Sequence, residues 1–276
     1  WDMSADTNMT TMFVYAEAFN GDVSTWNTSN VKEMAWMFGG ATSFDGDISS
    51  WDVSNVIEFQ GMFWRSNFNQ DISNWNTSSA KYLNSMFGYN TAFNQPIGSW
   101  DISKVENVNL MFDSATVFNQ PLNDWNLTSE NLSDTLVAVF RDAHAFNQPL
   151  DQWDMSGVKS LHLMFDGASA FNQDLGSWDV SSVTDMSSML TNSGLSPLNY
   201  GNTLQGWAAQ TVQNGVDLGA HGRQYFLGAA SDARESLISN YNWTISDNGP
   251  VLPDEVRVDI PTTVFSNQPF ALTAAL

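Results

Sequence analysis

The sequence predicts an α/β repeat protein: a right-handed solenoid of about eight turns, each about 25 residues long, with an α+β cap at its C-terminal end. Three recurring columns predict this fold. Tryptophan recurs at nearly constant spacing, a Met-Phe pair lies between successive tryptophans, and a Phe followed by Asn or Asp completes each repeat. Because periods of about 20 to 50 residues are typical of stacked repeats, we expect neighbouring turns to bury these columns.

The tryptophan column sets the register of the turns. Its positions are 1, 26, 51, 75, 100, 125, 153 and 178, so the steps are 25, 25, 24, 25, 25, 28 and 25 residues. A large indole at the same place in every turn is expected to dominate the core. We therefore expect these tryptophans to face inward and none of them to contact a ligand.

Each turn is predicted to contain a strand and a short helix. Ile48, Trp51, Val53 and Val56 have the spacing of the strand segment of a leucine-rich repeat. Since side chains alternate across a strand, Trp51 and Val53 should face inward and Asp52 outward. Apolar residues at steps of three and one between positions 31 and 44 favour a helical or 3₁₀ segment. The solenoid is therefore expected to be leucine-rich-repeat-like.

Four segments are predicted along the chain. The solenoid covers residues 1–190, a capping unit 191–248, a linker 249–255, and the first strands of a following, truncated domain 256–276. Within the cap, amphipathic patterns predict helices over 199–212 and 229–241, with strands near 216–218 and 243–245. The alternating residues from Val256 to Ile260 predict a further strand.

An outward polar column follows the tryptophans and is a candidate ligand-binding face. It comprises Asn27, Asp52, Asn76, Asp101, Asn126, Asp154 and Asp179. One hypothesis is a structural ladder in which asparagines donate hydrogen bonds to carboxylates of neighbouring turns; the other is a surface that binds a ligand. Calcium needs several converging oxygens, and only Asp154 and Asp179 are adjacent acids in the column, so we expect no metal site.

Four aromatic residues interrupt columns that elsewhere hold Gly, Asp, Ser or Arg. They are Tyr15, Trp36, Trp64 and Tyr89. We expect them to be exposed on the convex side of the N-terminal half. Since they occupy different columns, they are either scattered surface aromatics or a contact for a protein or a glycan.

Composition and motifs argue against several functions. Thirty Asp and Glu against nine Lys and Arg give a formal net charge of −21, which disfavours nucleic acid and anionic membrane surfaces. No apolar stretch of about 18 residues predicts a membrane span. His144, His162 and His221 occupy unrelated positions, and no phosphate loop or spaced metal cluster occurs. We therefore expect neither catalysis nor a cofactor.

The repeat units resemble those of a known family. Trp51-Asp52-Val53-Ser54-Asn55-Val56, followed by Met62-Phe63 and Phe68-Asn69-Gln70-Asp71-Ile72, is similar to BspA-like surface-protein repeats of bacterial exported proteins and mycoplasma lipoproteins. The resemblance covers residues 1–190, and residues 191–248 resemble the segment after such arrays in marine Bacteroidota proteins. It implies an extracellular solenoid within a longer exported protein, with adhesion as the usual role, no catalytic residues, and Ig-like domains as frequent neighbours, here at 256–276.

The sequence thus predicts a non-catalytic scaffold segment of a large bacterial surface protein. Its expected partner is a macromolecular surface ligand, either a protein or a glycan. The alternative is a structural segment of a cell-surface fibre or filament that contacts copies of itself.

Overall fold

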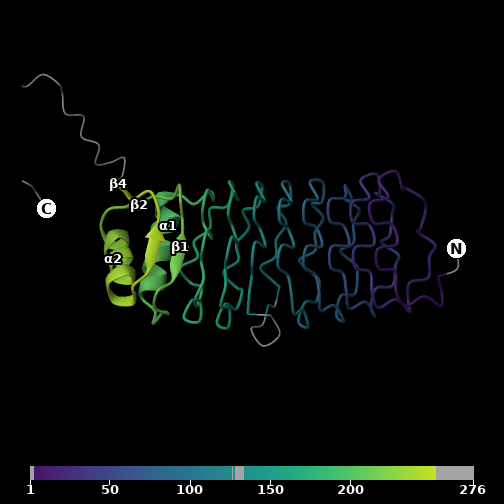
Figure 1. Cartoon of the computed structure of the whole chain (residues 1–276), viewed down its shortest axis with the longest axis horizontal. Helices are drawn as coiled ribbons and strands as arrows, with labels where there is room; N and C mark the ends of the chain where they lie inside the picture. The colour runs from purple at the N-terminus through teal and green to yellow at the C-terminus, as the bar shows by residue number, and fades with distance from the viewer. Residues whose placement is uncertain (1–2, 126, 128–133, 253–276) are drawn as a thin grey trace, which may run out of the picture.

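The chain is wound into successive turns that are stacked along one long axis (Figure 1). The computed structural model describes residues 3–125, 127 and 134–252. Parallel bridges join corresponding residues of neighbouring turns, in the order Asn8, Glu33, Glu58, Tyr82 and Asn107, and again in the order Thr135, Ser160 and Asp185. The step from one bridge residue to the next is 24 or 25 residues, so the stacking follows the sequence repeat.

The bridges do not lie in the segment for which a strand was predicted. In residues 48–56, the N–H of Trp51 donates to the carbonyl of Ile48 and the N–H of Val56 donates to that of Val53. The segment is therefore two consecutive tight turns, while the bridge to the next repeat lies at Glu58. The burial pattern was nevertheless predicted correctly, because Trp51 and Val53 are buried and Asp52 is exposed.

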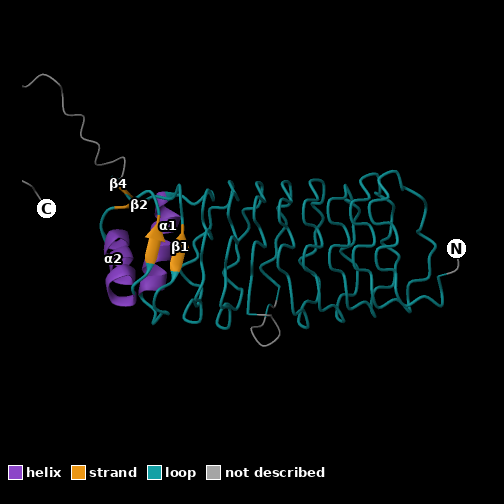
Figure 2. Ribbon diagram, in the orientation of Figure 1, coloured by secondary structure: helices purple, strands orange, loops and turns teal. Residues whose placement is uncertain are grey.

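Residues 34–41 form no helix, in contrast to the predicted helical or 3₁₀ segment (Figure 2). The N–H groups of residues 34, 36, 38 and 40 donate to carbonyls of the next turn, whereas those of residues 37, 39 and 41 donate three residues back. Trp36 and Gly40 have φ angles of 58° and 73°, as the third residue of a type II turn requires. Because half of the backbone N–H groups donate to the next turn, a continuous helix cannot form in this segment.

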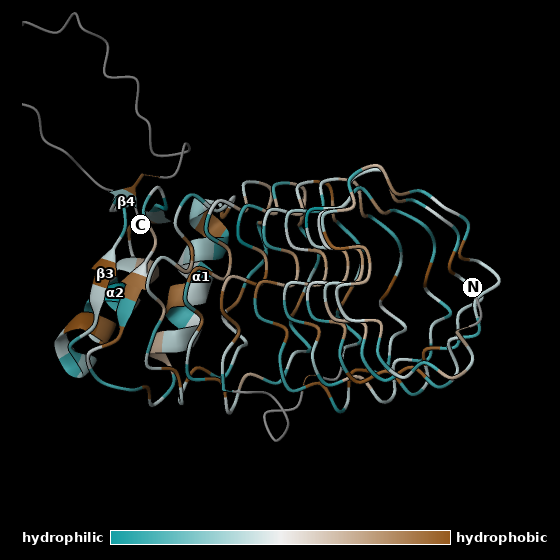
Figure 3. Cartoon of the chain, turned by 45° about the vertical axis from the view of Figure 1, so that its right-hand side comes forward, coloured by the Kyte–Doolittle hydropathy of each residue, from teal (hydrophilic) through white to brown (hydrophobic). Residues whose placement is uncertain are grey.

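The core consists of aromatic columns that run from turn to turn. Phe38, Phe63, Phe87 and Phe112 stack with ring centroids 5.7–6.0 Å apart. In Figure 3, hydrophobic stretches recur at corresponding places of adjacent turns. Stacked rings of this size bury large apolar areas between neighbours, which a single turn cannot do alone.

The tryptophans face the core, and their indole N–H groups are satisfied by the turn before. The members of the tryptophan column from Trp51 to Trp178 are at most 4% exposed, Trp26 is partly buried, and Trp1 lies outside the described residues. Trp75 Nε1 donates to the carbonyl of Ile48 at 3.2 Å, and Trp100 Nε1 donates to that of Ile72 at 3.1 Å. Each indole thus buries its ring and hydrogen-bonds the previous turn.

The C-terminal cap continues this stack with regular secondary structure. Helix α1 is Pro197–Ala208 and helix α2 is Ala229–Tyr241, which confirms the second predicted helix in full and the first with a shift of boundaries. Strand β1 (Asp217–Gly219) pairs in parallel with β3 (Thr244–Ser246), close to the two predicted strands.

Two short strands were not predicted. Strand β2 (Tyr225–Phe226) pairs in parallel with β4 (Pro250–Val251), so β4, which falls in the predicted linker, belongs to the cap. A bridge from Met186 to Leu218 joins the last turn to β1. Trp207 in α1 donates its indole N–H to the carbonyl of Leu175, which extends the tryptophan column into the cap. The strand and domain predicted for 256–276 lie outside the described residues.

Candidate functional site

The outward polar column is exposed, and its side-chain oxygens accept hydrogen bonds from within their own turns. Asp52 Oδ1 accepts from the N–H of Ser54 at 3.0 Å, and Asp101 Oδ1 accepts from that of Ser103 at 3.0 Å. The described members are all exposed and all accept from the residue two positions later; they are Asn27, Asp52, Asn76, Asp101, Asp154 and Asp179. Asn126 lies outside the described residues. The hypothesis of neighbour-to-neighbour bonds in this column is therefore not what the structure shows.

These within-turn bonds stabilise the charged carboxylates. The hydroxyl and backbone N–H of Ser54 lower the pKa of Asp52, and the backbone N–H and hydroxyl of Ser103 lower that of Asp101. Asp47 and Asp71, which come before the aliphatic column, accept from Ser49 and Ser73 in the same way, and their pKa values are also lowered. The carboxylates thus hold local turns together along the outside of the coil.

A second polar column joins neighbouring turns, and the sequence did not single it out. Asn69 Oδ1 accepts from the backbone N–H of Asn94 at 2.9 Å and from Nε2 of Gln95 at 3.0 Å. The same pair of bonds recurs from turn to turn, with acceptors Asp45, Asn69, Asn94, Asn119 and Asn147. We call these residues and their glutamine partners the Asn-Gln ladder. The recurring Phe-Asn-Gln triplet was the available signal.

The four aromatic residues that interrupt the columns lie together on one surface. We call them the aromatic cluster. Trp64 lies at its centre, with ring centroids 5.5 Å from Trp36, 6.0 Å from Tyr89 and 6.4 Å from Tyr15. All three contacts are edge-to-face, the geometry that ring quadrupoles favour. Tyr15 and Tyr89 occupy the same column, three repeats apart, so the prediction of four separate columns was wrong for this pair. Trp36 and Trp64 occupy two further columns, and stacking of the turns brings all three columns side by side, so the rings are not scattered.

Glycines in the following turn make room for these rings. A Cβ at Gly40 would lie 2.6 Å from Cδ1 of Tyr15, and a Cβ at Gly61 would lie 2.6 Å from the ring of Trp36. At Gly88 it would lie 3.0 Å from Cδ1 of Trp64. The two distances of 2.6 Å are too short for real Cβ atoms and that of 3.0 Å is a tight contact, so the rings of Tyr15, Trp36 and Trp64 each depend on a glycine 24 or 25 residues later.

The left-handed backbone at the cluster belongs to the repeat. Tyr15, Trp36 and Tyr89 have φ angles of 55°, 58° and 57°, which bulky residues rarely adopt. The same conformation recurs along the coil, for example at Leu110 and Leu163. The stacked turns impose this left-handed conformation at equivalent positions, and at the cluster three of those positions are aromatic residues.

A groove of about 300 Å³ runs beside the cluster. We call it the aromatic groove; its lining residues are Tyr15, Glu17, Gly40, Thr42, Arg65 and Tyr89. The guanidinium carbon of Arg65 lies 5.0 Å from the ring centre of Trp64 and 5.7 Å from that of Tyr89, within the range of cation–π contacts. Tyr15 and Tyr89 are 62% and 41% exposed, so both rings are accessible.

The far side of the groove is fixed by an ion pair. Arg141 Nη2 lies 2.6 Å from Oδ2 of Asp113 and 3.4 Å from the hydroxyl of Tyr89. The hydrogen bond to Asp113 raises the pKa of Arg141, so the guanidinium stays charged. Arg141 thus contacts Tyr89 from two turns further along the coil.

A serine, a histidine and an aspartate meet at a second place, but not as a catalytic triad. Nδ1 of His162 lies 3.0 Å from the carbonyl oxygen of Ser187 and 2.6 Å from its hydroxyl. A carbonyl oxygen only accepts, so Nδ1 carries the proton and cannot act as the base for that hydroxyl. The serine hydroxyl donates to Asp185 at 2.6 Å, so the carboxylate binds the serine rather than the imidazole.

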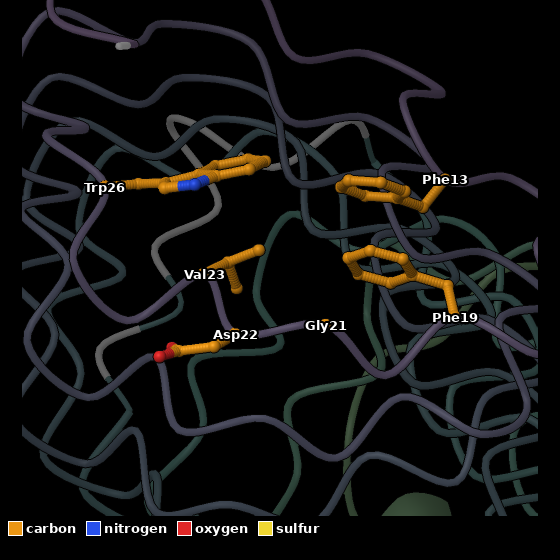
Figure 4. Close-up of a pocket in the computed structure, with 6 residues that line it drawn as sticks. All are labelled: Phe13, Phe19, Gly21, Asp22, Val23 and Trp26. Atoms are coloured by element: carbon orange, nitrogen blue, oxygen red, sulfur yellow. The ribbon is translucent and has the colours of Figure 1, made fainter. Parts of the chain in front are cut away.

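A pocket of about 140 Å³ opens at the N-terminal end of the described coil (Figure 4). Phe13 and Phe19 stack on one side of it, and the ring of Trp26 lies on the other. Equivalent rings in later turns are covered by the preceding turn. The pocket is therefore the open end of the core columns, and we do not assign a ligand to it.

We searched the described residues for metal-binding clusters and for membrane-spanning helices. These residues contain no group of three or more His, Cys, Asp or Glu residues placed to hold a metal ion. Their helices are too short or too polar to cross a bilayer.

The repeat is recognised by a family model described as "Mycoplasma protein of unknown function, DUF285". It matches three times in tandem, at residues 1–67, 64–136 and 133–218. The chain belongs to this family. The DUF285 matches establish a repeat protein and extend past the last tryptophan turn into β1. Comparisons with curated proteins and with solved structures find no match.

Proposed function

We propose that this DUF285 chain is a non-catalytic binding scaffold, a segment of a large bacterial surface protein of the BspA-like type. In this proposal its stacked turns form a leucine-rich-repeat-like, right-handed solenoid outside the cell. The segment mediates adhesion by binding a protein or a glycan.

The observation that carries this proposal is the convergence of the aromatic cluster. Stacking of four successive turns gathers two half-buried tryptophans and two exposed tyrosines beside an open groove. Clustered, rigid aromatic rings with a neighbouring arginine are the typical anchors of binding interfaces. The outer column of Asp and Asn supports the proposal less well, because its oxygens already accept hydrogen bonds within their own turns.

The test is binding of the full chain to immobilised collagen, mucin, laminarin and alginate, measured by surface plasmon resonance. We expect saturable binding to at least one of these surfaces, and loss of at least about tenfold in affinity in the double variant Tyr15→Ala/Tyr89→Ala. The matched control is Leu198→Ala/Leu227→Ala, which removes two side chains of the cap that are 57% and 52% exposed. Equal binding by both double variants would refute the proposal.

Sedimentation separates this function from the alternative, a self-assembling fibre segment. A chain that is monomeric at micromolar concentration and still binds a surface supports the binding scaffold. Reversible association that grows with concentration, without binding to any surface, supports the fibre instead.

A further inference from the structure

The aromatic groove combines apolar faces with a polar rim. The faces are the rings of Tyr15 and Tyr89, and the rim carries the carboxylate of Glu17, the hydroxyl of Thr42 and the guanidinium of Arg65. A sugar ring has the matching pattern, since its C–H groups form apolar faces and its hydroxyls point outward. Small-ligand sites typically pair an apolar lining with a few polar groups in this way.

Charge favours a neutral ligand over an acidic one. The groove has one acidic and one basic side chain, Glu17 and Arg65, so it has no local excess of positive charge. The chain as a whole has a net charge of −21, which repels polyanions at long range. Arg65 is also held over the rings of Trp64 and Tyr89, where its charge is already engaged.

Dimensions favour a chain of sugars over a single one. The volume of about 300 Å³ is at the lower limit of small-ligand pockets, so it accommodates only a short part of a ligand. Tyr15 and Tyr89 are three turns apart, which is roughly 14 Å at the spacing of paired strands, about 4.8 Å. An open groove of this length suits the passage of a polymer along the stack.

We infer that the aromatic groove binds a neutral polysaccharide, with sugar rings stacked on Tyr15 and Tyr89 and their hydroxyls bonded to Glu17, Thr42 and Arg65. This inference rests on the proposed binding function and names its ligand. The glycines of the next turn set the ring positions, since any side chain at Gly40 displaces the ring of Tyr15.

The inference is tested with the full chain and three soluble neutral polysaccharides, laminarin, mannan and xylan, with alginate and polygalacturonate as acidic controls. Affinity electrophoresis and calorimetry measure binding. We expect at least one neutral polymer to bind, with affinity that changes less than about twofold between about 0.05 and 0.5 M NaCl, because no ion pair with the ligand is formed. Tyr15→Ala should weaken this binding by about tenfold or more.

A second variant tests ring position without removing any groove side chain. Gly40→Ala forces the Tyr15 ring to move, because the new Cβ would lie 2.6 Å from Cδ1. Its control is Gly215→Ala, which has nearly the same φ, 72° against 73°, but no atom within 4 Å of the new Cβ. Both variants carry the same backbone strain, so only Gly40→Ala should lose affinity.

The outcomes distinguish the two proposals. Binding to acidic polymers alone, binding to none of the polymers, or binding to neutral polymers that Tyr15→Ala leaves unchanged would overturn the glycan assignment. If collagen or mucin binding is lost in Tyr15→Ala/Tyr89→Ala while no neutral polymer binds, the glycan is wrong and the binding scaffold stands. If the double variant binds every surface like the wild type, both proposals fail.

Discussion

Two polar columns run the length of the coil and differ in how far their hydrogen bonds reach. In the outer Asp and Asn column, Asp101 bonds the residue two positions later in its own turn. In the Asn-Gln ladder, Asn94 bonds Asn119 and Gln120, about one full turn away. The same periodicity thus yields a local brace in one column and a link between turns in the other. A repeat shows which residues lie above one another, but the local backbone decides which N–H groups face them.

The largest loss of stability is expected from a substitution in the Asn-Gln ladder. Asn94→Ala removes the acceptor of two donors, the backbone N–H of Asn119 and Nε2 of Gln120, both in half-buried residues. Gln120 Nε2 keeps its second bond, to the backbone carbonyl of Asn94, but the half-buried N–H of Asn119 loses its acceptor, so the free energy of unfolding should fall by about 1–3 kcal/mol. Urea denaturation followed by tryptophan fluorescence measures the change.

The control for this prediction is Asn94→Asp. A carboxylate keeps the acceptor oxygen, and Asp45 already accepts from Asn69 and Gln70 in the same ladder. We expect this variant to remain within about 1 kcal/mol of the wild type. If the ladder hydrogen bonds did not stabilise the coil, the two variants would have the same free energy of unfolding.

A smaller effect is expected in the outer column. Asp101→Ala removes the oxygen that accepts from the N–H of Ser103, but Asp101 is exposed and water can replace it. The loss of unfolding free energy should be below about 1 kcal/mol, with Asp101→Asn close to zero because Asn27 and Asn76 make the same bond. If Asp101→Ala were as damaging as Asn94→Ala, the distinction between the columns would be wrong.

The sequence predicted the stacking register and the inward columns, because they depend only on which residues recur. Trp75 and Trp100 are buried as expected, and helix α2 was predicted at its observed bounds. The local backbone was not predictable in this way. Trp36 and Arg65 adopt left-handed conformations that are typical of glycine and asparagine, so no turn signature marks them.

The candidate site was predictable by its residues but not by its assembly. Tyr15, Trp36, Trp64 and Tyr89 were identified because they depart from their columns. Their convergence depends on the lateral distance between columns, which follows from the tight turns rather than from the period. The glycines at positions 40, 61 and 88 were a usable signal, since each follows a cluster ring by one repeat.

The smallest expected effect is on the pH dependence of stability, which should come from the carboxylates that are braced within their turns and not from the asparagines of the ladder. Four carboxylates that are braced within their own turns have lowered pKa values, namely Asp47, Asp52, Asp71 and Asp101. A carboxylate whose pKa is lower in the folded chain than in the unfolded chain stabilises the fold above the unfolded pKa, about 3.9. It loses that contribution as pH falls through the folded pKa. The unfolding free energy should therefore decline below about pH 4.

Replacing these four residues together by Asn, which changes the formal charge from −21 to −17, should flatten that decline. The amide oxygen still accepts from the serine N–H but does not titrate, so stability at pH 7 should be nearly unchanged. Urea titrations from pH 7 to pH 2, carried out in about 0.5 M NaCl to screen general repulsion, measure the slope. An identical acid slope in both proteins would mean that these four carboxylates contribute nothing to the pH dependence of stability and that their braces do not differ from the asparagines of the ladder in this respect.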